Sequence, residues 1–443
     1  MTVATSPPSL RGALKELRRA VRGEVRAGDD ALGSYAYDGS IYRQLPIAVV
    51  IPKDAGDVER ALAVCRQHGL PVLPRGCGTA LAGQTVNAAV VFDFSKYMNR
   101  ILEVDPRRRI ARVEPGVICD SLRREAERYQ LTYGPDPATH DHATFGGMIG
   151  NNSCGVHSVM AGKTSENVLE LDVLLYDGLR MKVAGGISDE EFARILAEGG
   201  RRAEIYSGLK TLGDRYGDLI RRRFPEMPRR VSGYNLDQLL PENHFNLAAA
   251  LVGTEGTCAL VLEATVRLIP SPQNRTLVVV GYPDPPAAGR AAPEIMPHRP
   301  IGLEHFNRSI IEGLHEKGQH KGGEELLPEG EAWLLVEFGA DTREGSQEPA
   351  RRLIEALPAG AHPPLGMKLY EDDAEEKLVW DIRENGVGAS RVPPKHPGWP
   401  GWEDAAVPPD RIGDYLADFI ELCEKHGYSP TFFGHIGEGC VHT

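Results

Sequence analysis

A glycine-rich loop directly after a short apolar strand constrains this chain most strongly. The strand is expected at 72–73, and the loop follows over residues 74–84 with the sequence PRGCGTALAGQ. Its three glycines allow successive backbone N–H groups to turn toward one point, which makes a concavity suited to an anion such as pyrophosphate. The spacing matches neither the G-x-G-x-x-G fingerprint nor a P-loop. Taken alone, the loop is equally well interpreted as a tight surface turn.

Two further glycine-rich segments follow along the chain. One comprises GPDP at 134–137 and TFGGMIGNNSCG at 144–155, which is too rich in Gly, Asn and Ser for a core helix. A flexible loop is the alternative, but three apolar side chains would pack the segment down, and such packed polar segments usually lie against a ligand. The other is GTEGT at 253–257, after the apolar run 247–252, where a hairpin turn is equally plausible.

The apolar pattern predicts alternating strands and helices. An amphipathic helix is expected over 9–27, and strand, helix and strand follow over 47–73, which is a βαβ unit. The composition then becomes rich in proline and glycine, and we place a domain boundary near residue 271. The other expected elements are strands at 89–93, 110–113, 169–176, 260–268, 275–281 and 333–338, and helices at 190–224, 305–316, 348–357 and 410–426.

Charge and hydropathy exclude several classes of protein. The formal net charge of −12 argues against a nucleic acid as partner, because a phosphate binder needs a basic face. No apolar run is long enough for a transmembrane segment or a signal peptide, so we expect a cytoplasmic protein, free or peripherally attached to the inner membrane. The seven cysteines include no C-x-x-C pair, which argues against an iron–sulfur site within this chain.

Together, the three glycine-rich segments resemble the FAD-binding domain of the vanillyl-alcohol-oxidase and p-cresol-methylhydroxylase (PCMH) superfamily. The resemblance implies an α+β fold: a helical N-terminal segment (1–41), a two-subdomain PCMH-type FAD-binding domain (42–270) and a ferredoxin-like α+β substrate or cap domain (271–443). Some relatives attach the flavin through a histidine where this chain has Thr79, so FAD is expected to be bound non-covalently. The implied FAD contacts are Arg75, Gly76, Cys77, Gly78, Thr79, Gly83, Gln84, Pro135, Asp136, Thr144, Gly146, Gly147, Gly150, Asn151, Asn152, Gly155, Gly162, Val168, Glu255 and Gly256.

Within the superfamily, the chain is most similar to the D-lactate and D-2-hydroxyglutarate dehydrogenase branch. The segments RRVSGYNL (229–236) and HPGWPGWEDAAVP (396–408) resemble a subgroup whose flavin module is fused to a C-terminal iron–sulfur module. This implies oxidation of a D-2-hydroxy acid to the 2-oxo acid, with hydride passing to the flavin N5. WDIRE (380–384) resembles the family segment whose arginine, here Arg383, grips the substrate carboxylate. Without the resemblance, a surface arginine paired with a nearby glutamate is the better interpretation of this residue.

The last ten residues contain an H-x6-H pair, His435 and His442. Glycines between the two histidines permit a bend that brings the imidazoles together, and paired imidazoles suit Zn²⁺ or another divalent metal. Spacing alone favours a glycine-rich turn with two solvated histidines. The resemblance favours a metal site, because this branch has a G-H-x-G-[DE]-G-x-x-H motif.

The family pattern is incomplete in this chain. The family takes a third metal ligand and a catalytic base from an E-H-G sequence further along, whereas the only Glu-His pair here is Glu304-His305, followed by Phe306. Some related enzymes also carry a lysine where this chain has Trp402. We therefore expect an incomplete metal site with two ligands, no catalytic base within the chain, and a truncated C-terminal domain.

Three functions agree with these features. The first is FAD-dependent oxidation of a D-2-hydroxy acid of the D-lactate or D-2-hydroxyglutarate type, with electrons passed to an iron–sulfur module, a quinone or an electron-transfer flavoprotein. The second is a catalytically incomplete FAD-binding fragment or electron-transfer subunit. The third is an alcohol or sugar-acid oxidase that uses O₂. Arg383 and the histidine pair favour the first over the third, while the absent E-H-G sequence favours the second.

Overall fold

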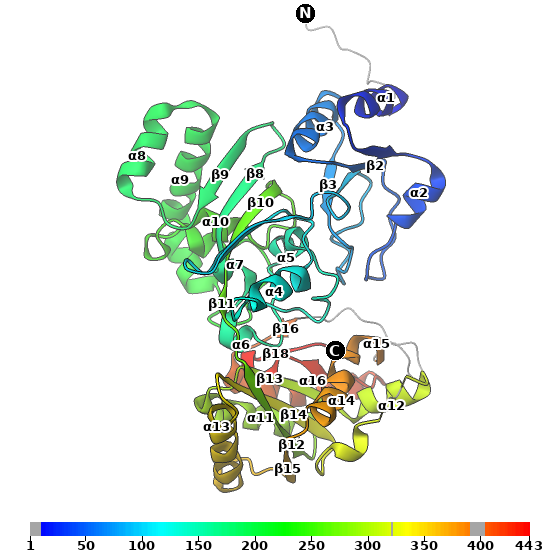
Figure 1. Ribbon diagram of the computed structural model, residues 1–443, viewed down its shortest axis with the longest axis vertical. Helices are drawn as coiled ribbons and strands as arrows, with labels where there is room; N and C mark the ends of the chain where they lie inside the picture. The colour runs from blue at the N-terminus through cyan, green and yellow to red at the C-terminus, as the bar shows by residue number, and fades with distance from the viewer. Residues whose placement is uncertain (1–9, 320–321, 390–403) are drawn as a thin grey trace, which may run out of the picture.

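The computed structural model describes residues 10–319, 322–389 and 404–443. Trp402 and residues 396–403 of the segment singled out above lie outside the described residues. Figure 1 shows two sheet-containing subdomains side by side, with the C-terminal domain below them. No helix among the described residues is both long and apolar enough to cross a membrane.

The first subdomain contains a four-stranded sheet of order β1-β2-β4-β3, in which only β1 is antiparallel to its neighbour. Its core lies between the sheet and helices α1 and α3, so the predicted βαβ unit is confirmed. The elements are α1 (Leu10–Ala20), β1 (Glu24–Arg26), α2 (Asp29–Ser34), β2 (Ala48–Ile51), α3 (Ala55–Gln67), β3 (Val72–Arg75) and β4 (Val90–Asp93).

The N-terminal segment is part of this subdomain and is shorter in helix than expected. Helix α1 ends at Ala20 because the buried Asp57 carboxylate accepts hydrogen bonds from the backbone N–H groups of Arg22 and Gly23, both at 2.9 Å. The same carboxylate accepts the Lys53 N–H at 3.0 Å. The chain then turns into β1, which pairs with β2. The apolar periodicity of the sequence continues to residue 27, but the buried Asp57 carboxylate ends the helix before that point.

The second subdomain contains an antiparallel five-stranded sheet of order β5-β6-β10-β8-β9. Residues 145–151 of the segment 144–155 form a helix, α5, so the prediction that the composition excludes a core helix is wrong. The Thr144 side chain caps this helix, and Phe145, Met148 and Ile149 are buried in the core, which offsets the low helix propensity of glycine. The elements are β5 (Ile101–Asp105), β6 (Ile110–Val113), α4 (Cys119–Glu127), α5 (Phe145–Asn151), α6 (Ser158–Ala161), α7 (Thr164–Asn167), β8 (Val168–Leu174), β9 (Arg180–Ala184), α8 (Asp189–Glu198), α9 (Gly200–Arg223), α10 (Leu247–Leu251) and β10 (Leu260–Arg267).

The C-terminal domain has the predicted ferredoxin-like arrangement. Its βαββαβ core has the strand order β15-β12-β14-β13, and β17 extends the sheet beyond β13. Helices α11, α13 and α16 cover one face, while α12, α14 and α15 cover the other. The elements are β12 (Asn274–Tyr282), α11 (Pro285–Ile295), β13 (Gly302–Asn307), α12 (Arg308–Glu316), β14 (Ala332–Ala340), α13 (Arg343–Ala356), β15 (Gly366–Leu369), α14 (Asp373–Glu384), α15 (Gly386–Ala389), α16 (Ile412–Lys425) and β17 (Phe433–Gly434).

Short elements complete the fold. The helix predicted over 305–316 is correct only from Arg308, since residues 305–307 belong to β13. Besides β17, the two-residue strands are β7 (Leu131–Thr132), which pairs with β11 (Ile269–Pro270), and β16 (Ala405–Ala406), which pairs with β18 (Cys440–Val441). The 3-10 helices are η1 (Leu236–Leu239), η2 (Pro241–Asn243), η3 (Met296–His298), η4 (Glu324–Leu326), η5 (Leu357–Ala359), η6 (Pro409–Arg411) and η7 (Ile436–Glu438).

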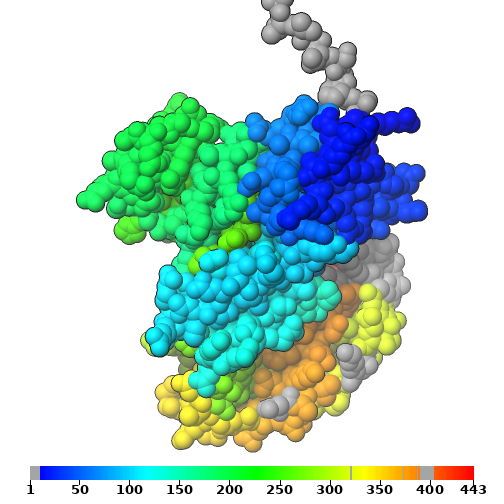
Figure 2. All heavy atoms as spheres, turned by 45° about the horizontal axis from the view of Figure 1, so that its top comes forward, coloured from blue at the N-terminus to red at the C-terminus, as the bar shows by residue number. Residues whose placement is uncertain are grey.

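A buried ionic network joins the FAD-binding half to the C-terminal domain, whose surfaces are seen in contact in Figure 2. His157, just before α6, bonds through Nδ1 to Asp136 and through Nε2 to Glu337 on β14, the latter at 2.7 Å. Arg275 of β12 lies 3.5 Å from the Glu337 carboxylate. Although burial opposes its charge, Asp136 and Glu337 raise the pKa of His157 from 6.5 to about 9. At neutral pH the interface therefore holds a charged imidazolium between two carboxylates.

This network predicts that stability falls on the alkaline side. The folded protein binds the His157 proton more tightly than the unfolded chain does. The contribution of the network to the free energy of unfolding is therefore complete below pH 6.5 and is lost as the pH rises through about 9. The change in pKa corresponds to ~3 kcal/mol. Melting temperatures between pH 6 and pH 10 (about the range that brackets both pKa values) should fall more steeply for the unsubstituted protein than for His157→Gln. Exposed His426→Gln is the control, and equal slopes for His157→Gln and the unsubstituted protein would contradict the assignment.

Candidate functional site

A cavity of about 500 Å³ lies where the three glycine-rich segments meet the end of the chain. It extends from the loop 74–85 across α5 to the C-terminal histidines. A volume of this size is typical of ligand-binding cavities. The predicted site residues that line it are Arg75, Gly76, Cys77, Gly78, Thr79, Gln84, Thr144, Gly146, Gly147, Gly150, Asn151, Asn152, Glu255, Gly256, His435 and His442.

The other predicted residues lie outside the cavity wall. Asp136 faces His157, and a Cβ on Gly155 would lie 2.0 Å from the Asp136 carbonyl oxygen, so this part of the segment has a packing role. Val168 is buried at the start of β8. The remaining predicted residues away from the wall are Gly83, Pro135, Gly162 and Arg383. The FAD contacts assigned to this group stay predictions.

Arg75 shapes the first glycine-rich loop from within. Its buried guanidinium donates to the carbonyl oxygens of Tyr37 at 2.7 Å, Thr85 at 2.8 Å and Tyr35 at 3.2 Å. These three bonds tie both ends of the loop to residues 35–37. The arginine is therefore a support for the backbone that faces the cavity.

Helix α5 leaves space that a cofactor could fill. A Cβ on Gly150 would meet nothing nearer than the Glu255 Cα at 3.9 Å, and one on Gly147 only the Thr144 Oγ1 at 3.4 Å. Both glycines line the cavity, so side chains there would extend into it without displacing protein. The absence of side chains at these positions lets a ligand approach the backbone closely, which fits an extended cofactor such as FAD.

The histidine pair acquires a third possible metal ligand in Asp404. The ligand atoms of Asp404, His435 and His442 all lie within 4.8 Å of one another, and the two imidazole rings are 5.2 Å apart. The pairing of β16 with β18 brings Asp404 there, and its backbone N–H donates to His442 Nδ1 at 3.3 Å. The sequence predicted two ligands within the chain, and this cluster adds Asp404 as a third group that could bind a metal; metal binding itself stays a prediction. Two imidazoles and one carboxylate form a donor set that suits catalytic Zn²⁺.

A buried carboxylate, Glu304, supports His435. His435 Nδ1 lies 2.8 Å from one Glu304 oxygen, and Arg383 donates to the other at 2.5 Å. When Nδ1 donates to the carboxylate, the Nε2 lone pair is left free for a metal, as in carboxylate–histidine–metal arrangements. Burial, together with the charge of Arg229, holds the pKa of His435 well below its usual range, so the ring is neutral at neutral pH.

Arg229 is a second buried guanidinium at this end of the cavity. It is 3% exposed, lines the cavity and donates to Glu438 at 2.7 Å. Its guanidinium also lies 3.7 Å from the Asp404 carboxylate. Sequence reasoning noted the segment 229–236 only for its likeness to a subgroup and missed Arg229, Glu304 and Asp404. Glu304 and Asp404 are distant in sequence from the histidines that they contact, as Arg229 is from Glu438, and no local pattern reveals such contacts.

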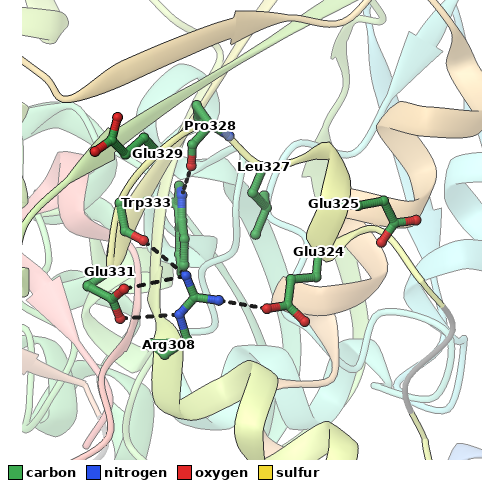
Figure 3. A pocket seen from close by; sticks show the side chains of 9 residues that line it. Arg308, Glu324, Glu325, Leu327, Pro328, Glu329, Glu331 and Trp333 are labelled. Carbon is green, nitrogen blue, oxygen red and sulfur yellow. Dashed lines mark hydrogen bonds and ion pairs between the residues drawn. The ribbon is translucent and has the colours of Figure 1, made fainter.

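A second cavity, of about 540 Å³, lies on the C-terminal domain and is open to solvent. Figure 3 shows Arg308 beside the Trp333 ring, with dashed lines to Glu324 and Glu331. The arginine is thus already paired, and the wall contains neither a glycine-rich loop nor the histidine cluster. The candidate site is the first cavity.

Comparisons with known proteins agree with this fold. Residues 46–184 match the FAD binding domain family, and residues 271–443 match the family described as FAD linked oxidases, C-terminal domain. The D-2-hydroxyglutarate dehydrogenase of Pseudomonas putida is 32% identical over 97% of this chain, and the chain spans 44% of that relative. The glycolate oxidase subunit GlcD of Bacillus subtilis is 28% identical over 97% of this chain and 80% of its own length.

A solved structure supports the same assignment at the level of fold. p-Cresol methylhydroxylase with substrate bound has a TM-score of 0.64 over 99% of this chain and 83% of its own, at 14% identity. Together with the two family matches, this likeness confirms the resemblance noted from the glycine-rich segments. The chain belongs to the FAD-linked oxidases of the vanillyl-alcohol-oxidase and p-cresol-methylhydroxylase superfamily.

The space beside α5 predicts an effect of Gly150→Val on FAD affinity. The new side chain fits the protein but occupies the cavity, so FAD affinity should fall roughly 10- to 100-fold with little change in the melting temperature of the FAD-free protein. FAD titration followed by flavin fluorescence measures this. Gly208→Val is the control, because Gly208 also lies in a helix with open space beside it. Unchanged FAD affinity in Gly150→Val would place the cofactor elsewhere.

The ligand cluster predicts which substitutions weaken Zn²⁺ binding. His435→Ala and Asp404→Ala should each lower the affinity by at least the roughly 10- to 100-fold expected for Glu304→Gln, which removes only a supporting carboxylate. Isothermal titration of the FAD-loaded protein with Zn²⁺ gives the affinities. Exposed His426→Ala should leave them unchanged. Full affinity in Asp404→Ala would remove that residue from the ligand set.

Proposed function

We propose that this protein binds FAD non-covalently and oxidises a D-2-hydroxy acid of the D-lactate or D-2-hydroxyglutarate type to the 2-oxo acid. The observation that carries the proposal is a single cavity, lined by the glycine-rich segments at one end and by His435, His442 and Asp404 at the other. Thr79 lines the FAD end, where some relatives have the histidine that attaches flavin covalently. Electrons would pass to a separate acceptor.

The names of the relatives support this class of substrate. D-2-Hydroxyglutarate and glycolate, which appear in the relatives' names, are both 2-hydroxy acids. Such a substrate needs a partner for its carboxylate, an acceptor for its hydroxyl proton and an acceptor for its hydride. The chain offers cationic and metal-binding groups at one end of the cavity and the cofactor segments at the other.

The residues of the chain have distinct roles in this scheme. A divalent metal held by His435, His442 and Asp404 would lower the pKa of the substrate hydroxyl, so that its proton could pass to solvent water while FAD would accept the hydride. Glu304 orients His435, and Arg383 balances the charge of Glu304. Gly147 and Gly150 have no side chains that would fill the cavity, so the reacting carbon of the substrate could approach the flavin. That Arg383 itself grips the substrate carboxylate stays a prediction, since the guanidinium pairs with Glu304 here.

Anaerobic mixing tests the proposal. The FAD- and Zn²⁺-loaded protein should lose its flavin absorption on addition of D-2-hydroxyglutarate or D-lactate, but not of L-lactate. His435→Ala should slow the reduction by roughly 100-fold, because the metal no longer stabilises the developing alkoxide. His426→Ala serves as the matched control. If no 2-hydroxy acid reduces the flavin, the proposed function is wrong.

A further inference from the structure

Asp404 is the most exposed of the three candidate metal ligands. Its side chain is 40% exposed, whereas His435 is buried and bonded to Glu304. The backbone of Asp404 lies in the left-handed region with a φ of 50°, a conformation that is uncommon outside glycine. The pairing of β16 with β18 begins only at the next residue, Ala405. Little in the backbone therefore fixes the direction of this carboxylate.

Two side chains among the described residues contact the Asp404 carboxylate, and both meet the same oxygen. The Cys440 thiol donates to Oδ1 at 3.5 Å, and a terminal nitrogen of Arg229 lies 3.7 Å from that oxygen. A thiol is a weak donor and a guanidinium is a charged one, so Arg229 is the stronger of the two partners. Because both contacts are to Oδ1, they leave Oδ2 for a metal.

We propose that Arg229 is a positioning residue for the candidate metal site and directs the Asp404 carboxylate toward the two histidines. This inference rests on the proposed function, in which Asp404 is a metal ligand. It concerns only the metal site and leaves the predicted role of Arg383 unchanged. Arg229 belongs to the FAD-binding half, so one half of the chain would orient a ligand that the other half supplies.

The guanidinium of Arg229 is itself held in place. It is 3% exposed, and one terminal nitrogen donates to Glu438 at 2.7 Å while the other faces Asp404. Glu438 lies on η7, the turn between His435 and His442. The planar guanidinium thus bridges the turn between the histidines and the segment that carries Asp404. Loss of such a supporting group usually weakens metal binding roughly 10- to 100-fold.

The backbone around Arg229 is anchored in the FAD-binding half. Lys163 Nζ donates to the carbonyl oxygen of Pro228 at 2.8 Å. The carbonyl oxygen of Val231 lies beside Gly253 of the third glycine-rich segment, where an added Cβ would be 3.6 Å from it. Arg229 therefore reaches the ligand cluster from a backbone that is fixed next to the segments expected to hold the cofactor.

A purely electrostatic role is the alternative for Arg229. A cation near the cluster repels a metal ion, so its loss alone would leave Glu438 unpaired and strengthen Zn²⁺ binding. The double variant Arg229→Met/Glu438→Gln keeps the net charge and removes the guanidinium. A role through charge alone predicts unchanged Zn²⁺ affinity in this variant, whereas loss of positioning predicts weaker binding.

Isothermal titration of the FAD-loaded protein with Zn²⁺ separates the two roles. The double variant should bind Zn²⁺ roughly 10- to 100-fold more weakly than the unsubstituted protein. Arg230→Met/Asp237→Asn is the matched control and should bind Zn²⁺ normally. This neighbouring pair, 2.7 Å apart, also loses one charge of each sign, and Arg230 does not line the cavity.

Arg229→Lys provides a milder variant in case the double variant does not fold. Lysine keeps the charge but lacks the planar fork that bridges Glu438 and Asp404, so its Zn²⁺ affinity should be intermediate. In an Asp404→Ala background, Arg229→Lys should change the Zn²⁺ affinity by less than roughly twofold, because the carboxylate that it positions is gone. Independent, additive effects of the two substitutions would overturn the inference.

Failure of this inference can be told apart from failure of the proposed function. Flavin reduction by the D-2-hydroxy acids tests the function in the unsubstituted protein, while Zn²⁺ affinities rank the arginine variants whether or not reduction occurs. The inference is also overturned if the unsubstituted protein does not bind Zn²⁺, or if Arg229→Met/Glu438→Gln binds it as tightly as Arg230→Met/Asp237→Asn does.

Discussion

The candidate site depends on how the C-terminal domain is held against the FAD-binding half. The cavity has walls from both, so a small rotation between them would separate the glycine-rich segments from the histidines. The buried contact of His157 with Asp136 and Glu337 fixes this relation with charged hydrogen bonds, which are strongly directional. Arg123, 3.6 Å from Asp136, and Arg275 extend the network on either side. Breaking one member would leave a buried charge without its partner, so the network acts as a unit.

The ionisable groups around His435 and His442 are carboxylates and guanidiniums whose charges partly cancel. Three carboxylates, Glu304, Asp404 and Glu438, lie with two guanidiniums around the pair. These carboxylates outnumber the guanidiniums by one, which disfavours an anionic substrate. A divalent cation would reverse that sign, and a bound carboxylate would then neutralise it. The same arrangement would thus favour a metal and, once the metal is held, an acid, as the proposed function requires.

The parts of the fold that sequence predicted are those set by local pattern. Apolar runs located β10, β12 and β14, and the glycine-rich segments located one wall of the cavity. Prediction failed where a distant group decided the outcome. Asp57 ended α1 by capturing the Arg22 and Gly23 N–H groups, and tertiary burial of Phe145 and Met148 made a helix of a glycine-rich run. In the site, H-x6-H spacing located the histidines, but Glu304 and Asp404 reach them only through strand pairing.

The distribution of the site along the chain affects how such a protein can diverge. The residues expected to hold the cofactor lie before residue 257, while Asp404, His435 and His442 flank β16, η7 and β18, all after residue 403. Substitutions in the C-terminal domain can therefore alter the histidine end of the cavity without disturbing the glycine-rich segments. Arg229 is the exception, because it belongs to the first half yet faces the second.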